Sequence, residues 1–360
     1  DSRGVVSTCS YEARRFGVRS AMASAEARRL CPQAIWTHGH FDRYREVSAQ
    51  VMAILAEETP RVERVSIDEA FIDITPGRFA PEDPLLVARR ISDRVAALGV
   101  TCSIGVGCNK TVAKIASERD KPFGLTIVRP GTEQRFLAAL PVSAMSGIGR
   151  SAEERLRRMR IYTLGELSRA PESTLAAIFG VNGERMRQRA LGLEISEVTS
   201  LDEEREVKSV SNERTFAKDL TERGDIEAAI ALLGESVGRR LRRQGLTGGT
   251  VTLKLKYSYG SGRSAQRRLP HPTDDENIFV AVALELLNNI WQEGMHVRLA
   301  GIGMSDFDHQ GGIQTDLFCE VDDRGAQSSD RRELSVAIDA VRDKFGDTAL
   351  SFGRQSRFND

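Results

Sequence analysis

The strongest constraint on the fold comes from residues 61–75, where two apolar segments flank the polar pair Asp68-Glu69. The apolar residues on the two sides of this pair are Val62, Val65, Ile67, Phe71, Ile72 and Ile74. β-Branched and aromatic residues favour strands, and a short polar centre between two such segments favours a turn. The segment therefore predicts a β-hairpin that presents two adjacent carboxylates at its tip.

Two neighbouring carboxylates at a hairpin tip predict a site for a hard cation. In an extended strand Asp68 and Glu69 would point to opposite faces, but in a tight turn both can approach one ligand. Carboxylate oxygens suit Mg²⁺, and two such ions about 4 Å apart stabilise the attacking and leaving oxygens of a phosphoryl displacement. The alternative is a polar turn without a ligand, because turns favour Asp in any case.

The segment that follows predicts an α+β layer with helices on one face. Asp83-Pro84 is typical of a helix start and Gly99 of a helix end, and Asn109 can cap a second helix. The pattern predicts helices at 84–98 and 109–119 and strands at 100–106 and 125–128. This order of strands and helices is typical of an α+β domain.

The rest of the chain predicts a helical region and a second α+β unit. Residues 141–193 show short helical segments, and residues 194–206 are acidic and weakly periodic, as in a linker. The second unit is predicted to contain helices at 225–243 and 274–293 and strands at 250–259 and 298–306. A last helix is predicted at 333–345.

Charge is unevenly distributed along the chain. The 51 basic and 51 acidic residues cancel, which excludes a wholly basic DNA-coating protein. Residues 207–270 nevertheless hold 13 basic and 6 acidic side chains, whereas residues 273–360 hold 8 and 17. A basic middle predicts a surface for a nucleic-acid backbone. The alternative is that Arg239, Arg240, Arg242 and Arg243 form an ordinary solvated helix face.

Cysteine usage and hydropathy predict a cytoplasmic protein. The five cysteines show no C-x-x-C spacing, which favours reduced thiols. No apolar segment approaches the length of a membrane span.

Several motifs together resemble the Y-family DNA polymerases of the DNA polymerase IV type. S-I-D-E-A-F at 66–71, N-K-T-V-A-K-I-A-S at 109–117 and D-K-P-F-G at 120–124 resemble the palm of that family. S-Y-E-A-R at 10–14 resembles its fingers. The motifs follow the family's order at compatible spacings, and the resemblance extends to about Phe307.

The resemblance implies an α+β right-hand polymerase, with a ferredoxin-like palm and a thumb that contains a helix-hairpin-helix. The implied parts are fingers 1–38, palm 39–140, thumb 141–193, linker 194–206, an α+β little finger 207–308 and a C-terminal tail 309–360. Nucleotide cyclases use a related palm, but they need neither the thumb nor the second unit.

The implied function is error-prone translesion DNA synthesis, which transfers a deoxynucleotide to a primer 3′-hydroxyl. Asp68 matches a metal ligand, and Glu69 matches both a metal ligand and the active-site residue, with two Mg²⁺ ions per site. Primer-template DNA and deoxynucleoside triphosphates are the implied partners of a monomeric enzyme.

The resemblance also implies residues that hold the incoming triphosphate. Tyr11 and Arg14 match finger residues, Lys121 matches a palm lysine, and Thr8 adds a hydroxyl. Arginine offers a fork of donors to phosphate oxygens and lysine a point charge. The alternative for residues 11–14 is a helix start with a surface arginine.

Two further motifs imply contacts with macromolecules. Gly147-Ile148-Gly149 resembles a hairpin whose backbone N–H groups approach a DNA phosphate, although a plain helix-linking turn is the alternative. Gln314, Leu317 and Phe318 resemble the sliding-clamp-binding peptide of bacterial polymerases. The alternative is a Leu-Phe pair that packs on its own domain.

One part of the family pattern has no counterpart in this sequence. Family members open with a strand of the form Asp-x-Asp-x-Phe, which supplies a bridging metal carboxylate and the steric gate against ribonucleotides. We expect this strand to lie upstream of the sequence given, in an active polymerase, so that the sequence given is by itself incomplete for catalysis. The alternative is a non-catalytic relative that binds DNA and the clamp.

Overall fold

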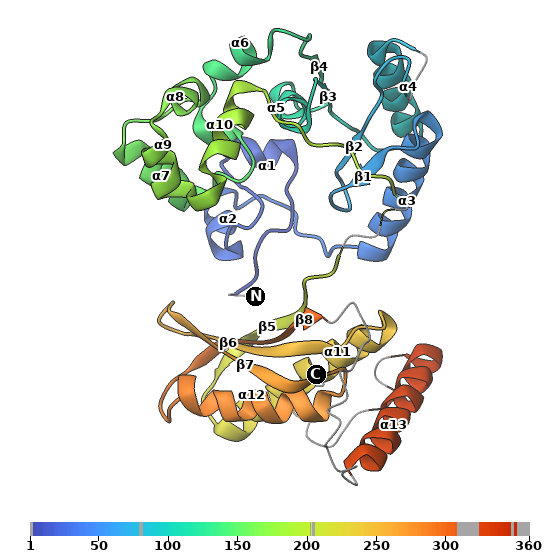
Figure 1. Cartoon of the computed structure of the whole chain (residues 1–360), viewed down its shortest axis with the longest axis vertical. Coiled ribbons are helices and arrows are strands. Elements are labelled where there is room, and N and C mark those ends of the chain that lie inside the picture. Colours follow the sequence, from blue (N-terminus) through green and yellow to red (C-terminus); the bar gives the residue numbers. More distant parts are fainter. Residues whose placement is uncertain are drawn as a thin grey trace, which may run out of the picture. The chain divides into compact units, whose positions relative to one another are not determined.

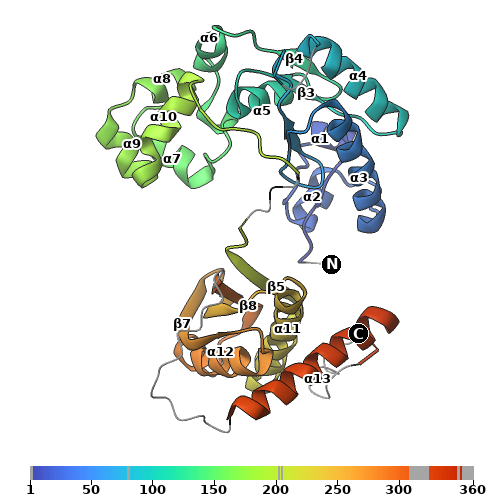
Figure 2. The same ribbon diagram turned by 45° about the vertical axis from the view of Figure 1, so that its right-hand side comes forward.

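The computed structural model describes residues 3–78, 82–201, 203, 206–307, 324–346 and 349–350 (Figures 1 and 2). The chain divides into two compact units. One comprises His38–Glu204, and the other comprises Asp1–Thr37 together with Arg205–Asp360. No helix in the described ranges is both long enough and apolar enough to span a membrane.

The first unit, 38–204, begins with short strands and longer helices. Its elements up to residue 127 are α3 (Phe41–Glu58), β1 (Val62–Arg64), β2 (Ala70–Ile72), α4 (Pro84–Ala97), β3 (Ile104–Val106), α5 (Lys110–Arg119) and β4 (Leu125–Ile127). β1 and β2 pair antiparallel, with Val62 opposite Ile72, so the predicted hairpin is confirmed. β3 and β4 pair in parallel.

The predicted helix starts are confirmed by their caps. Asp83 accepts a hydrogen bond from the Leu85 amide at 2.8 Å, and Asn109 accepts one from the Val112 amide at 3.0 Å. Such caps satisfy amides that have no partner within the helix. The strand predicted at 100–106 is shorter, because its pairing with β4 begins only at Ile104.

The helical region predicted at 141–193 is confirmed. It contains η1 (Val142–Ala144), α7 (Arg150–Arg158), α8 (Leu164–Arg169), α9 (Glu172–Phe179), η2 (Gly180–Asn182) and α10 (Gly183–Leu191), and α6 (Glu133–Ala138) precedes it. Leucines of these helices share one hydrophobic core with Val112, Ile115 and Ala116 of α5. The helical region and α5 are therefore packed as one body.

The acidic segment predicted as a linker is held against the same unit from residue 194 to residue 203. Glu194 is nearly buried and accepts hydrogen bonds from the Thr111 hydroxyl at 2.5 Å and the Thr111 amide at 3.2 Å. The Ser200 hydroxyl donates to the Pro60 carbonyl, and Glu203 pairs with Arg61 at 2.7 Å. The acidic side chains thus serve as acceptors for defined donors.

The second unit contains a four-stranded antiparallel sheet with two helices on one face (Figure 1). Its elements are β5 (Ser209–Leu220), α11 (Arg223–Arg243), β6 (Gly248–Tyr257), β7 (Gly262–Thr273), α12 (Glu276–Ile290) and β8 (Val297–Phe307), with sheet order β5-β8-β6-β7. Residues such as Val237, Leu253 and Phe279 form the core between the sheet and the helices. The same unit includes α1 (Tyr11–Arg15) and α2 (Ser24–Leu30), which have a small core of their own.

The sequence predicted α11, β6, α12 and β8 but did not predict β5 or β7. Both missing strands lie at the edges of the sheet. Few of their residues are buried, so they lack the apolar pattern by which strands are found. β7 also contains Pro270 and Pro272, which are tolerated at a sheet edge but argue against a strand in sequence.

The C-terminal helix α13 (Arg324–Phe345) begins earlier than the predicted Glu333. It changes the interpretation of the basic face of α11. Arg239 and Arg242 keep only 12% and 6% of their side-chain surface exposed, because acidic residues of α13 pair with them. The alternative of an ordinary solvated face is therefore wrong for these two arginines. No local sequence signal linked the two helices.

An ion pair between α3 and α4 makes the stability of the first unit depend on pH. Arg90 donates to both carboxylate oxygens of Glu58, at 2.6 and 3.0 Å, and these bonds hold the pKa of Glu58 below its usual value. The stabilisation is present above the unfolded-state pKa of about 4.3 and is lost as the pH falls through the lower folded-state pKa.

We therefore expect the wild-type protein to lose more unfolding free energy than Glu58→Gln on acidification from about pH 6 to about pH 3. Urea unfolding monitored at each pH would measure the difference. If the free energy of unfolding fell equally with pH in the two proteins, the Glu58–Arg90 pair would not contribute to the pH dependence of stability.

Candidate active site

The tip of the β1–β2 hairpin is a closed turn with a fixed position on α3. The amides of Val65 and Ser66 both donate to the Glu69 carbonyl, at 2.9 and 3.1 Å. The Ser48 hydroxyl of α3 donates to the Ile67 carbonyl at 2.5 Å. These bonds hold the backbone that carries the two predicted metal ligands.

Asp68 is exposed and oriented by a serine of the same turn. The Ser66 hydroxyl donates to Asp68 Oδ1 at 2.6 Å, and the Asp68 amide lies 3.3 Å from the same hydroxyl. The carboxylate is therefore accessible to solvent but has a preferred orientation.

Glu69 is linked to Lys121 through two residues of α5. Lys114 Nζ lies 3.0 Å from Glu69 Oε1 and 3.1 Å from Glu118 Oε1. Glu118 Oε1 also accepts from Lys121 Nζ at 2.7 Å. Two predicted site residues are thus joined by a chain of alternating charges.

The two central members of this chain of charges, Lys114 and Glu118, have shifted pKa values. Burial alone would lower the pKa of Lys114, but its hydrogen bonds with Glu69 and Glu118 outweigh burial and raise the pKa. Burial would raise the pKa of Glu118, but the bonds from Lys121 and Lys114 lower it overall. Lys114 was not singled out in the sequence. Its i,i+4 spacing predicts a pair with Glu118, but nothing local signals Glu69.

The donors at the hairpin tip fit a divalent metal ion. Asp68 and Glu69 provide adjacent, accessible carboxylates, and Glu69 already attracts the ammonium group of Lys114. Within the described residues, no group of three or more His, Cys, Asp or Glu side chains could hold a metal ion. The pair alone leaves coordination positions open, as expected where substrate phosphates complete the sphere.

The predicted finger residues lie on α1 in the other unit. Ser10 caps this helix, and the guanidinium of Arg14 lies 5.5 Å from the centre of the Tyr11 ring. Thr8 is exposed just before the helix. The Nε of Arg14 is buried and has no hydrogen-bond partner in the part of the chain that the structure describes. A donor in this state is suited to an anionic ligand.

The Gly147-Ile148-Gly149 turn lies before α7. Gly147 adopts φ +94°, and Arg189 donates to the Ser146 carbonyl at 2.8 Å, which fixes the turn. The Ile148 side chain is buried in the helical core, so an approaching phosphate could meet only the backbone of this turn. A Cβ atom at Gly149 would meet no atom within 4 Å, so the space beside the backbone is open.

The face of the sheet opposite α11 and α12 is also open. Val251, Leu253 and Leu255 of β6 are buried against the helices, so the alternate residues Lys254 and Lys256 lie on the other face. Gly301 and Gly303 of β8 pair with this side of β6. The Glu213 side chain of β5 lies over Gly301 and accepts a hydrogen bond from Lys254 Nζ at 2.8 Å. The predicted clamp residues Gln314, Leu317 and Phe318 lie outside the described residues.

Sequence comparisons identify the family. Residues 1–118 match the impB/mucB/samB family, and residues 207–317 match its C-terminal domain. The DNA polymerase IV of Lactococcus lactis subsp. cremoris (strain MG1363) is 39% identical over 307 residues, which cover 85% of this chain and 84% of the relative. The chain belongs to the DNA polymerase IV group of the Y-family DNA polymerases. The DNA polymerase IV of Dehalococcoides mccartyi (strain CBDB1) is 34% identical over 362 residues, 100% of this chain and 90% of the relative.

Solved structures share the fold. A Y-family DNA polymerase chimera of Dbh and Dpo4 matches with a TM-score of 0.74 and 24% identity, over 85% of this chain and 88% of that chain. DinB from Sulfolobus solfataricus matches with a TM-score of 0.52 and 23% identity, over 84% and 88%. The α+β polymerase fold and the enzyme class, a DNA-directed DNA polymerase of translesion synthesis, are confirmed.

Proposed function

We propose that the full-length protein transfers a deoxynucleoside monophosphate to a primer 3′-hydroxyl, with Asp68 and Glu69 at the reaction centre. The observation that carries the proposal is the fixed hairpin tip, which presents both carboxylates on an accessible turn. Primer extension on a primed template by the full-length protein tests it. Absence of extension by that protein with every combination of divalent metal and triphosphate would contradict it.

Family membership implies a dependence on divalent metal, and we propose two Mg²⁺ ions held in part by Asp68 and Glu69. When bound, such ions stabilise the charge that develops on the attacking and leaving oxygens. Ser66 orients Asp68 for this role, and Lys114 holds Glu69 toward α5. The non-catalytic alternative has no support among the relatives, which are named as polymerases.

We assign the triphosphate to two groups of donors. Lys121 provides a point charge that Glu118 positions, and Arg14 offers guanidinium donors beside the Tyr11 ring. The Thr8 hydroxyl adds a donor near the same helix. Charged donors of this kind bind phosphate oxygens strongly.

Lys121→Ala should raise the KM for the incoming triphosphate about tenfold or more, because one charge-assisted hydrogen bond contributes about 1.5–3 kcal/mol. Steady-state extension of a primer by a single nucleotide would measure KM and kcat. Arg129→Ala, which removes an equal charge at an exposed site, should leave KM unchanged. Equal effects of the two variants would remove Lys121 from the binding site.

The remaining proposals concern partners. Primer-template DNA would meet the backbone of the Gly147–Gly149 turn and the Lys254–Lys256 side of the sheet, and binding would weaken steeply with salt. We further propose a monomer that binds the sliding clamp through Gln314, Leu317 and Phe318. A cytoplasmic location is supported by the described cysteines, which are all free thiols.

A further inference from the structure

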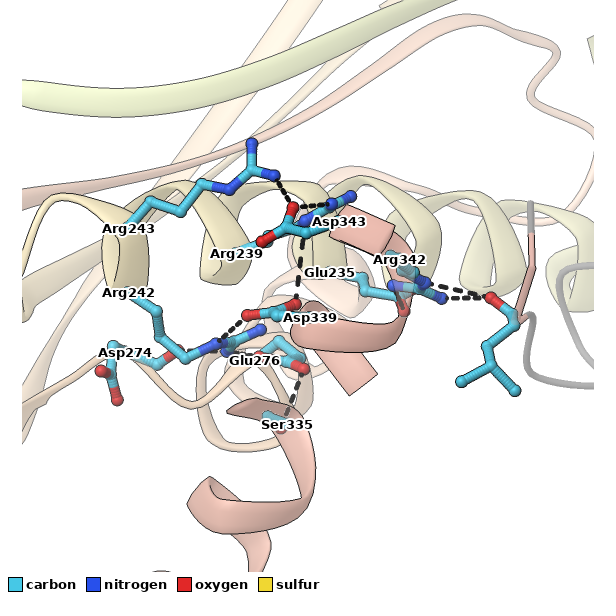
Figure 3. A network of polar contacts seen from close by, with 11 residues as sticks. Glu235, Arg239, Arg242, Arg243, Asp274, Glu276, Ser335, Asp339, Arg342 and Asp343 are labelled. Carbon is cyan, nitrogen blue, oxygen red and sulfur yellow. Dashed lines mark hydrogen bonds and ion pairs between the residues drawn. The ribbon is translucent and has the colours of Figure 1, made fainter. Parts of the chain in front are cut away.

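Helix α13 is attached to α11 and to the start of α12 mainly through charged side chains (Figure 3). At the centre of the contact, Arg242 donates to Asp339 at 2.7 Å and to Glu276 at 2.5 Å. The Arg242 side chain is only 6% exposed. Gly238 leaves room for this arrangement, because a Cβ atom there would lie 2.5 Å from the Glu276 carboxylate and 3.1 Å from Arg242 Nη1.

Two arginines of α11 converge on one carboxylate of α13. Arg239 Nη2 lies 2.7 Å from Asp343 Oδ1, and Arg243 donates to the same oxygen (Figure 3). On the other side of the contact, Arg342 of α13 pairs with Glu235 of α11 and donates to the Leu350 carbonyl at 2.6 and 3.0 Å. Each helix therefore provides both basic and acidic side chains to the contact, and each of these pairs with an opposite charge on the other helix.

Apolar burial contributes little to this attachment. Leu334, Val336 and Phe345 of α13 remain 60%, 49% and 67% exposed, whereas Ser335, Asp339 and Arg342 are buried. Buried ion pairs fix one geometry but add little net stability, because desolvation offsets the attraction. The exposed pair between Arg243 and Asp343 is weak and screened by salt. A contact of this composition can open and close.

The surface beneath α13 has the chemistry of a phosphate-binding site. Arg239, Arg242 and Arg243, here called the α11 arginine face, lie within five residues at the C-terminal end of the helix. Guanidinium groups bind carboxylate and phosphate oxygens with the same fork of donors. This face lies on the helical side of the sheet, opposite the open side that carries Lys254 and Lys256.

We propose that the α11 arginine face is a second DNA-backbone-binding surface, and that α13 covers it with Asp339 and Asp343 in the places of two phosphates. DNA is the favoured ligand because the family acts as DNA polymerases and because these contacts require no base sequence. α13 thereby competes with DNA for this face. The proposal does not depend on the roles given to Asp68 and Glu69.

The test compares Asp343→Asn with wild type in the full chain, using fluorescence anisotropy of a labelled primer-template duplex at several salt concentrations. Asp343→Asn removes the carboxylate charge that Arg239 and Arg243 share, so that a phosphate can take its place. We expect affinity to rise several-fold at low salt, and the slope of log affinity against log salt to steepen by about one to two. Glu333→Gln, which removes one charge from an exposed position of α13, is the matched control.

The triple change Asp343→Asn, Arg239→Gln, Arg243→Gln should abolish the gain. A gain that persists in this variant, or one equal to that of Glu333→Gln, would overturn the proposal. If Asp343→Asn raised the affinity for an acidic polypeptide, poly-glutamate, as much as the affinity for DNA, the α11 arginine face would be assigned to acidic proteins instead of DNA.

Hydrogen exchange of the wild-type protein gives a second measurement that does not depend on any variant. Amides of residues 333–345 should exchange faster when saturating duplex DNA is present, because DNA displaces the helix. Unchanged or slower exchange there would contradict the competition.

Discussion

Asp68→Ala should lower the single-turnover rate of primer extension about a hundredfold to a thousandfold, as does removal of one preorganised electrostatic group from other active sites. The affinity for primer-template DNA should change by less than about twofold, since a single exposed charge contributes little to backbone binding. Rapid-quench measurement with saturating DNA and triphosphate would give the rate, and anisotropy the affinity.

Asp93→Asn is the matched control for this change, because Asp93 is an exposed acid on α4 away from the hairpin. Its rate should equal that of the wild type. Glu69→Gln should lower the single-turnover rate about as much as Asp68→Ala does. A higher metal concentration should partly restore the rates of both variants. Wild-type rates for Asp68→Ala would show that the hairpin tip is a turn without catalytic ions.

Gly105→Ala should lower the free energy of unfolding by about 3 kcal/mol or more, since overpacking of a well-filled site typically costs 1–3 kcal/mol and backbone atoms cannot move aside cheaply. Gly105 lies in β3, and a Cβ atom there would overlap the Ala113 carbonyl and the Ser117 amide of α5. Displacement of α5 would also move Lys114 and Lys121, so we expect extension activity to fall as well.

Urea unfolding would measure the stability of this variant. Gly149→Ala is the control, because its Cβ atom would meet nothing within 4 Å and its φ of −82° suits any residue. It should unfold like the wild type. Equal stability of Gly105→Ala and wild type would mean that β3 and α5 are not packed as described.

Local signals predicted much of the fold. The hairpin at 61–75 and the caps Asp83 and Asn109 depend on neighbouring residues, and the structure confirms them. β5 and β7 were missed because edge strands need little apolar surface. The shortened β3 reflects the length of its partner β4, which its own residues cannot signal.

The site was predictable only in part, and for a similar reason. Asp68 and Glu69 were predicted as a pair adjacent in sequence and Lys121 through a motif, and these assignments stay predictions. Lys114 was missed because its contact with Glu69 joins residues 45 positions apart. The pairing of α11 with Asp339 and Asp343 spans about a hundred residues, so no local pattern distinguished it from solvation.

The core shared by α5 and the helical region 141–193 limits how this polymerase can be divided. Val112, Ile115 and Ala116 share one buried core with Leu156, Leu164 and their neighbours. Exchange of residues 141–193 alone between relatives would leave one side of that core facing foreign side chains. A functional chimera of this unit should therefore take α5 and the helical region from the same parent.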